Sequence, residues 1–138
     1  MNFYGQGQEF LLLEDAIEAG GMAWWLMELP SKAVYFSANK IIMLGYAKRD
    51  MEKFTRYTDF TEIIHPDDYQ GAMQAMQDHL EGVSPMYETQ YRIKAKDGSF
   101  KTFYDRGRIV GRKGKEIAIA GIVLDITNMA PKGLPANA

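Results

Sequence analysis

The sequence predicts an α+β fold, a five-stranded antiparallel sheet covered on one face by helices. Two short apolar stretches near the start have the length of strands, and the middle of the chain carries helix signals. Three long stretches near the end alternate apolar and polar residues or are almost wholly apolar. The first strands must pair with the last ones to complete a single sheet.

Composition narrows the class of protein. A chain of 138 residues fits one domain with a real core. Its net charge of -2 gives no general attraction to nucleic acid or anionic lipid. No apolar run approaches the ~20 residues that span a bilayer, and the opening MNFYGQGQEF lacks the pattern of a secretion signal. We therefore expect a cytoplasmic protein, with no membrane contact by this segment.

The N-terminal part predicts a loose leader over residues 1–8 and a helix over 9–21 that ends at glycine. At 100° per residue, Phe10, Leu13 and Ile17 form one apolar stripe, whereas Leu12, Ala16 and Ala19 form a second. A surface helix of a monomer needs only one apolar face. Either the helix packs deeply against its own domain, or its second face meets another copy of the chain. We expect the second arrangement, a homodimer with these residues at or beside the interface: Phe10, Leu12, Leu13 and Ile17.

The next segments predict a hairpin and then helices. The stretches MAWWLMEL and AVYFS form two strands around the turn PSK. SANKIIMLGY predicts a short helix, and the region up to Ile64 is rich in helix signals but broken. HPDDYQGAMQAMQDHLEG is the clearest helix: Pro66 suits the first helical position, and Asp67 and Asp68 lie where the helix dipole favours negative charge.

Three strands close the chain. PMYETQYRIKA and SFKTFYDRGRIVGR flank the tight-turn signal Asp97-Gly98, and EIAIAGIVLDI has the apolar character of a central strand. Gly121 within it marks a place where another group approaches the backbone closely. Nine of the sixteen Lys and Arg residues lie between Arg92 and Lys115. The alternation places most of these charges on a solvated face, diluted by acidic residues that include Asp105, so we expect no nucleic-acid partner.

Catalytic and metal-binding patterns are absent from the sequence. There is no nucleophile elbow and no phosphate-binding loop, and the absence of cysteine removes thiol chemistry. His65, just before Pro66, is explained by a helix start. His79 is expected to be half-exposed near a helix C-terminus, about 80° from the centre of the apolar stripe, which disfavours it as a haem ligand. We therefore expect neither an enzyme nor a metal site.

An ordered set of motifs resembles a PAS sensor domain. The set is GGMAWWLMEL, VYFS, LGY, IIHPDD, YETQYRIKAKDGSFKTFYDRGRIV and IAGIVLDIT, and it runs from about Glu9 to Thr127. The resemblance is to the subclass with a His-Pro-Asp-Asp helix start and a closing Asp-Ile-Thr. It implies the strand order 2-1-5-4-3, with a ligand-facing side under the helices and an outer side used for signalling contacts.

The resemblance also implies a function. We expect a sensory module over residues 9–127 that binds a small ligand or mediates dimerisation and relays a signal to an output domain. That output would be a histidine kinase, a cyclic-dinucleotide enzyme or a transcription regulator, reached through a tail or linker over 128–138. The alternatives are a ligand-free dimerisation module with a filled core and a small cavity-containing enzyme, which a titratable pair facing a pocket would favour.

The same resemblance suggests site residues. Asp125 and Thr127 match the motif that joins the last strand to the output and are expected to relay the signal. The absence of cysteine excludes a cysteinyl-flavin, and we expect no tightly bound cofactor and a colourless protein. Residues on the inward faces of the predicted elements are expected to line the ligand pocket: Trp25, Met27, Met43, Met73, Met76 and Tyr91.

Overall fold

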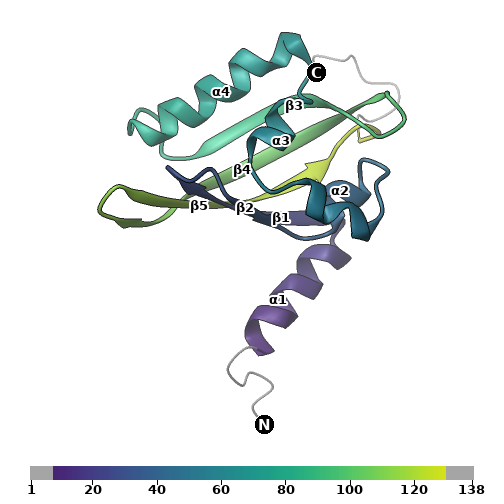
Figure 1. Cartoon of the computed structure of the whole chain (residues 1–138), viewed down its shortest axis with the longest axis horizontal. Coiled ribbons are helices and arrows are strands. Elements are labelled where there is room, and N and C mark those ends of the chain that lie inside the picture. Colours follow the sequence, from purple (N-terminus) through teal and green to yellow (C-terminus); the bar gives the residue numbers. More distant parts are fainter. Residues whose placement is uncertain (1–7, 130–138) are drawn as a thin grey trace.

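The computed structural model describes residues 8–129, and its five strands form one antiparallel sheet in the order β2-β1-β5-β4-β3. This confirms the predicted α+β fold. The strands are β1 (Met22–Leu29), β2 (Val34–Phe36), β3 (Tyr87–Lys94), β4 (Phe100–Lys113) and β5 (Glu116–Asp125). The helices are α1 (Gln8–Ala19), α2 (Asn39–Ile42), α3 (Thr58–Thr61), α4 (Pro66–Leu80) and the 3-10 helix η1 (Lys48–Lys53). Figure 1 shows α2, α3 and α4 above one face of the sheet.

The sheet is closed by pairing between the two ends of the chain. β1 and β5 are antiparallel neighbours, with Trp25 opposite Gly121 and Met27 opposite Ile119. Because side chains alternate along a strand, these residues share the helix-covered face of the sheet. β4 continues that face, since its Gly107 lies opposite Gly121.

The core lies between the sheet and the helices. Strand residues from β3, β4 and β5 meet helical residues from the segment around α2 there. Fully burying one large apolar side chain contributes about 1.5–3 kcal/mol relative to leaving it in water. The largest side chains with almost no exposed surface are Phe103, Ile41, Leu44, Ile93, Ile119 and Val123.

The start of α4 is fixed from two sides. His65 is the N-cap, and its Nδ1 accepts the backbone N–H of Asp67 at 3.1 Å, which confirms its expected role at a helix start. Asp68 then accepts hydrogen bonds from the backbone N–H and the guanidinium of Arg92 in β3, at 2.8 to 3.0 Å. These bonds hold α4 across the edge strand of the sheet.

His79 differs from its expected half-exposed position. The side chain is buried, and its ring lies between two backbone groups. Nε2 accepts the N–H of Ile109 at 2.9 Å, and Nδ1 lies 3.0 Å from the carbonyl oxygen of Ser84. This arrangement needs the neutral ring with its proton on Nδ1. His79 thus ties the end of α4 to β4.

α1 projects away from the rest of the domain (Figure 1). Deep packing of this helix against its own domain, the first of the two expected alternatives, is therefore wrong. Two of its side chains contact Trp24 of β1: Glu14 accepts the indole N–H at 2.9 Å, and the Phe10 ring lies edge-on at 6.2 Å. Phe10, Leu12 and Leu13 remain 48 to 64% exposed.

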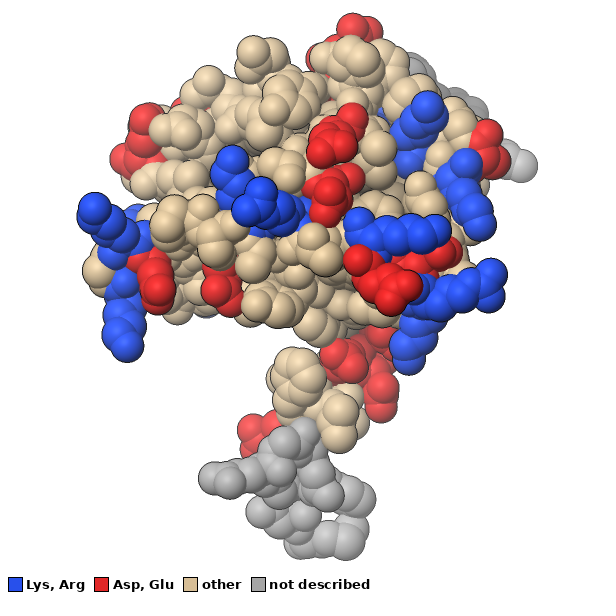
Figure 2. All heavy atoms as spheres, viewed as in Figure 1, with Lys and Arg blue, Asp and Glu red and all other residues tan. Residues whose placement is uncertain are grey.

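The expected leader over 1–8 and tail over 128–138 fall largely outside the described residues. Within residues 8–129, no helix has the length and hydrophobicity to cross a membrane. On the face drawn in Figure 2, acidic and basic side chains are interspersed.

Candidate functional site

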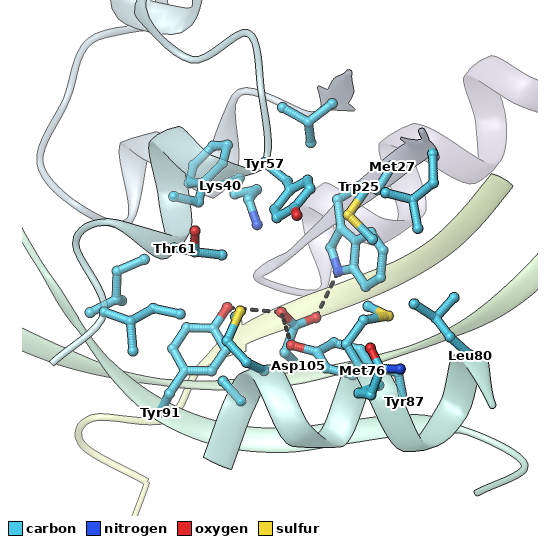
Figure 3. A pocket seen from close by; sticks show the side chains of 18 residues that line it. Trp25, Met27, Lys40, Tyr57, Thr61, Met76, Leu80, Tyr87, Tyr91 and Asp105 are labelled. Carbon is cyan, nitrogen blue, oxygen red and sulfur yellow. Dashed lines mark hydrogen bonds between the residues drawn. The ribbon is translucent and has the colours of Figure 1, made fainter. Parts of the chain in front are cut away.

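A cavity of about 230 Å³ lies between the sheet and the helices. Its walls come from β1, β2, β3 and β4 on the sheet side, from α4, and from the segment between β2 and α4 (Figure 3). Five of the six residues expected at a pocket line it: Trp25, Met27, Met73, Met76 and Tyr91. The sixth, Met43, packs against the core and is not among the lining residues.

Most of the lining is apolar. Methionine and leucine side chains from α4 face aromatic and branched residues of the strands. Methionine is unbranched and flexible, so such walls adapt to the shape of a bound molecule. The apolar and aromatic residues in this lining are Trp25, Met27, Leu29, Val34, Tyr57, Phe60, Ile64, Ala72, Met73, Met76, Leu80, Tyr87, Tyr91 and Ile93.

A buried carboxylate, Asp105 of β4, forms the polar floor of the cavity. It accepts hydrogen bonds from the Trp25 indole N–H at 2.7 Å and from the Tyr91 hydroxyl at 2.8 Å, and a long one from Tyr87 at 3.5 Å. Burial raises the pKa of Asp105, while Lys40 and these three donors act in the opposite direction. Burial also raises the pKa values of Tyr87 and Tyr91 well above their usual range, so both phenols keep their protons and act as donors.

Two glycines make room for the indole of Trp25. A Cβ added at Gly107 would lie 2.8 Å from the ring, and one added at Gly121 would lie 2.5 Å from it. Real Cβ atoms do not approach other atoms so closely, and only glycine fits at these two positions. The close approach predicted at Gly121 is therefore the Trp25 ring, which the two glycines allow to reach Asp105.

The other charged group at the cavity is Lys40 of α2. Its side chain is only 6% exposed, and its Nζ lies 4.3 Å from the centre of the Phe60 ring. Burial lowers the pKa of Lys40, and the charge of Asp105 raises it in part. In Figure 3 the Lys40 nitrogen points toward the space enclosed by the lining residues.

Sequence reasoning missed both charged residues. Asp105 is expected on the solvated face of the hairpin, but its place two residues from Phe103 and Gly107 puts it on the inward face. The two-residue alternation of side chains along the strand could have identified Asp105 as an inward-facing residue. Lys40 stands in a short helix with no clear apolar period, so no sequence pattern indicated that its side chain would be buried.

The exit of the chain from the sheet is fixed by Asp125 and Thr127. Asp125 Oδ1 accepts both the backbone N–H and the hydroxyl of Thr127. The same hydroxyl oxygen accepts the N–H of Thr102 in β4 at 2.9 Å, and Ile126 donates its N–H to the Thr102 carbonyl at 2.8 Å. β4 therefore connects the floor of the cavity at Asp105 with the exit, three residues away.

His79 is not placed to ligate a haem in the cavity. His79 does not line the cavity, and both of its ring nitrogens face backbone groups. Within residues 8–129, no three His, Asp or Glu side chains are grouped in a way that could hold a metal ion.

Comparison with known proteins places the chain in a family. The family model described as the PAS fold matches residues 33–123, about two-thirds of the sequence. The chain belongs to the PAS family. The PAS match covers β2 to β5 and thus includes Lys40 and Asp105, the two charged residues of the cavity.

One curated relative of this PAS domain is the methyl sulfide methyltransferase-associated sensor of Methanosarcina acetivorans. The two are 31% identical over 105 residues, which is 75% of this chain and 10% of that sensor. The PAS domain thus spans about a tenth of the length of its curated relative.

Two solved structures resemble the domain closely in fold. One is a sensory box histidine kinase/response regulator from Burkholderia thailandensis, at a TM-score of 0.71 and 24% identity over 88% of this chain and 86% of that one. The other is the N-terminal domain of a diguanylate cyclase with a PAS/PAC sensor from Marinobacter aquaeolei, at a TM-score of 0.65 and 21% identity over 77% and 95%. At these identities the likeness concerns the fold.

Proposed function

We propose that this PAS domain is the sensory module of a signalling protein and that it binds a small molecule in the cavity between sheet and helices. The cavity itself is the observation that carries the proposal, because a ligand-free dimerisation module would have a filled interior. At about 230 Å³ it lies below the ~300–1,000 Å³ of sites for drug-sized molecules, which favours a small ligand.

The relay of the signal is proposed to run along β4. Asp105 forms the cavity floor, and Phe103, two residues before it in β4, is the register partner of Asp125 in β5. A ligand that changes the hydrogen bonds of Asp105 would move β4 against β5 and alter the bonds between Thr102 and Thr127. Asp125 and Thr127 would then set the direction in which the chain leaves the sheet.

The output domain and the dimer are part of the same proposal. Kinase and cyclase names among the structural neighbours, and the sensor name of the curated relative, support an output domain such as a histidine kinase or a cyclic-dinucleotide enzyme. The exposed apolar faces of α1 support pairing with a second copy. A cytoplasmic location remains a prediction from composition.

One observation favours a small enzyme as a second candidate. Lys40 and Asp105 are a titratable pair facing one cavity, the feature that would indicate catalysis. However, the oxygens of Asp105 already accept bonds from three donors, so the carboxylate is poorly placed as a general base. Turnover of a small carbonyl compound through a Schiff base on Lys40, trapped with borohydride, would support the enzyme instead.

The test is a thermal-shift and calorimetric screen of small aromatic and aliphatic compounds. At concentrations well above its Kd, a cavity ligand should raise the melting temperature by several degrees. Ala72→Leu, which fills space in the cavity wall, should abolish the effect. Gln70→Leu places the same leucine side chain on the exposed side of α4 and should retain it. If no compound stabilises the unmodified protein, the proposal fails.

A further inference from the structure

We propose that the cavity recognises a small carboxylate, with the Lys40 ammonium holding the anionic group and the methionine and aromatic walls holding an apolar body. The inference deepens the proposed function and rests on it, because it names the chemical class of the ligand. It follows from counting the hydrogen-bond donors and acceptors that face the cavity.

Asp105 is satisfied within the protein. The Trp25 indole donates to one of its oxygens, and the Tyr91 and Tyr87 hydroxyls donate to the other. These three donors are used up by the same bonds. Both oxygens of Asp105 thus have partners within the protein, so a ligand cation gains less from this carboxylate than an anion gains from an unpaired ammonium.

Lys40 is the group left without an acceptor. In the part of the chain that the structure describes, no hydrogen bond or ion pair engages its Nζ, and its close neighbour is the face of the Phe60 ring. Every fully enclosed side-chain nitrogen or oxygen of the described residues has a hydrogen-bond partner. The Lys40 nitrogen, which has none, must therefore keep open surface, and the space it faces is the cavity (Figure 3).

A buried ammonium without a partner is costly, and an anion is the group that offsets the cost best. A carboxylate would accept two of the three N–H groups of Lys40. The Tyr57 hydroxyl, on the same side of the cavity in Figure 3, offers a further donor. Among the residues that the structure describes, no ion pair within 4.0 Å joins Lys40 to Asp105. The three donors that surround Asp105 partly offset its repulsion of a second carboxylate.

The chemistry and volume of the lining indicate what the part of the ligand beyond the carboxylate should be. Apart from Lys40, Asp105, Thr61 and Gln77, the lining side chains are apolar or aromatic. The available volume suits one ring or a short branched chain. Benzoate combines both features and serves as the probe, and benzyl alcohol and benzylamine have the same ring with a neutral and a cationic group.

The experiment is isothermal titration of the purified domain with the three probes at pH 7. Benzoate is expected to bind at least about tenfold more tightly than benzyl alcohol, because a charged hydrogen bond is lost with the alcohol, and benzylamine is expected not to bind. Lys40→Met keeps the apolar stem and should remove the preference for benzoate while benzyl alcohol still binds. Lys48→Met removes the same charge from an exposed position and should leave all three affinities unchanged.

The outcomes separate the two proposals. Equal binding of benzoate and benzyl alcohol, or a benzoate preference that survives in Lys40→Met, overturns the carboxylate inference and leaves a ligand-binding cavity. Failure of all three probes to bind the unmodified domain counts against both. If Lys40→Met does not fold, the order of the three probe affinities on the unmodified domain still tests the carboxylate inference.

Discussion

Two aspartates of this domain illustrate how surroundings set the role of one residue type. Asp105 is buried and surrounded by neutral donors, so burial is the strongest influence on its pKa and raises it. Asp68 lies at the start of α4 beside the Arg92 guanidinium, whose hydrogen bonds lower its pKa to about 2. Asp105 forms the polar floor of the cavity, whereas Asp68 binds α4 to the edge strand β3 through Arg92.

The Asp68–Arg92 pair should make stability depend on pH. The folded pKa of Asp68 lies below the unfolded value of about 3.9, so its contribution is present above pH 4 and is lost as the pH falls toward 2. Asp68→Asn is expected to lower the free energy of unfolding by about 1 kcal/mol at pH 7, a modest loss because Arg92 is 43% exposed and water screens the pair. Urea denaturation at pH 7 and at pH 2 measures both values.

The control for this prediction is Asp67→Asn, because the Asp67 side chain is 79% exposed and its carboxylate lies 4.0 Å from Arg92. It should change stability much less. A difference between Asp68→Asn and the unmodified protein that persists undiminished at pH 2 would contradict the assignment.

Gly121→Ala tests the space held for Trp25. The new methyl group would collide with the indole and with the Arg106 carbonyl oxygen, and we expect a loss of about 3 kcal/mol, the upper end for overpacking. Gly111→Ala is the matched control in β4, since nothing lies within 4 Å of its Cβ position. Thermal unfolding of both variants provides the comparison, and equal stabilities would show that the glycine is dispensable.

At the scale of elements, α1 differs from the other helices in the number of large apolar side chains that it exposes. Both of its apolar stripes are largely in water, although Phe10 and Glu14 contact Trp24 at the start of the sheet. Exposed apolar surface that is continuous over a helix commonly marks an association site. The geometry is consistent with pairing of two α1 helices and defines the residues to change.

Leu12→Glu should convert a dimer to a monomer, because it places a charge on the face that two α1 helices would share. The measurement is sedimentation equilibrium at high protein concentration. Gln70→Glu adds the same charge on exposed α4 and should leave the dimer intact. A monomeric unmodified protein, or a dimer that persists in Leu12→Glu, would refute the role of α1.

The elements differ in how far the sequence could predict them. The hairpin of β3 and β4 and the cap of α4 were predictable because alternation, Asp97-Gly98 and Pro66 act locally. The direction of α1 was not, since two apolar stripes fit both a buried helix and a paired one. The burial of His79 was also missed, because the backbone groups it binds belong to a distant strand and to the loop after α4.

At the scale of the whole molecule, the sheet and helices enclose a cavity whose position could be predicted from inward-facing residues. Trp25, Met27 and Tyr91 were identifiable because side chains alternate along a strand and each of these residues lies on the face toward the helices. The chemistry of the cavity depends on Lys40 and Asp105, which face the same cavity only after α2 folds over the sheet. Residues that meet only in the folded chain produce no pattern of spacing in the sequence from which their contact could be predicted.

The proposed function requires that a molecule bound in the cavity changes the structure at the exit of the chain. The decisive measurement is titration of the ¹⁵N-labelled domain with benzoate and with benzyl alcohol, followed by amide correlation spectra. We expect saturable shifts for cavity residues such as Ile93 and Ala72 and, at the same midpoint, for Thr102 and Thr127. Saturable shifts at the cavity with no change at Thr102 and Thr127, or no saturable shifts with either compound, would contradict it.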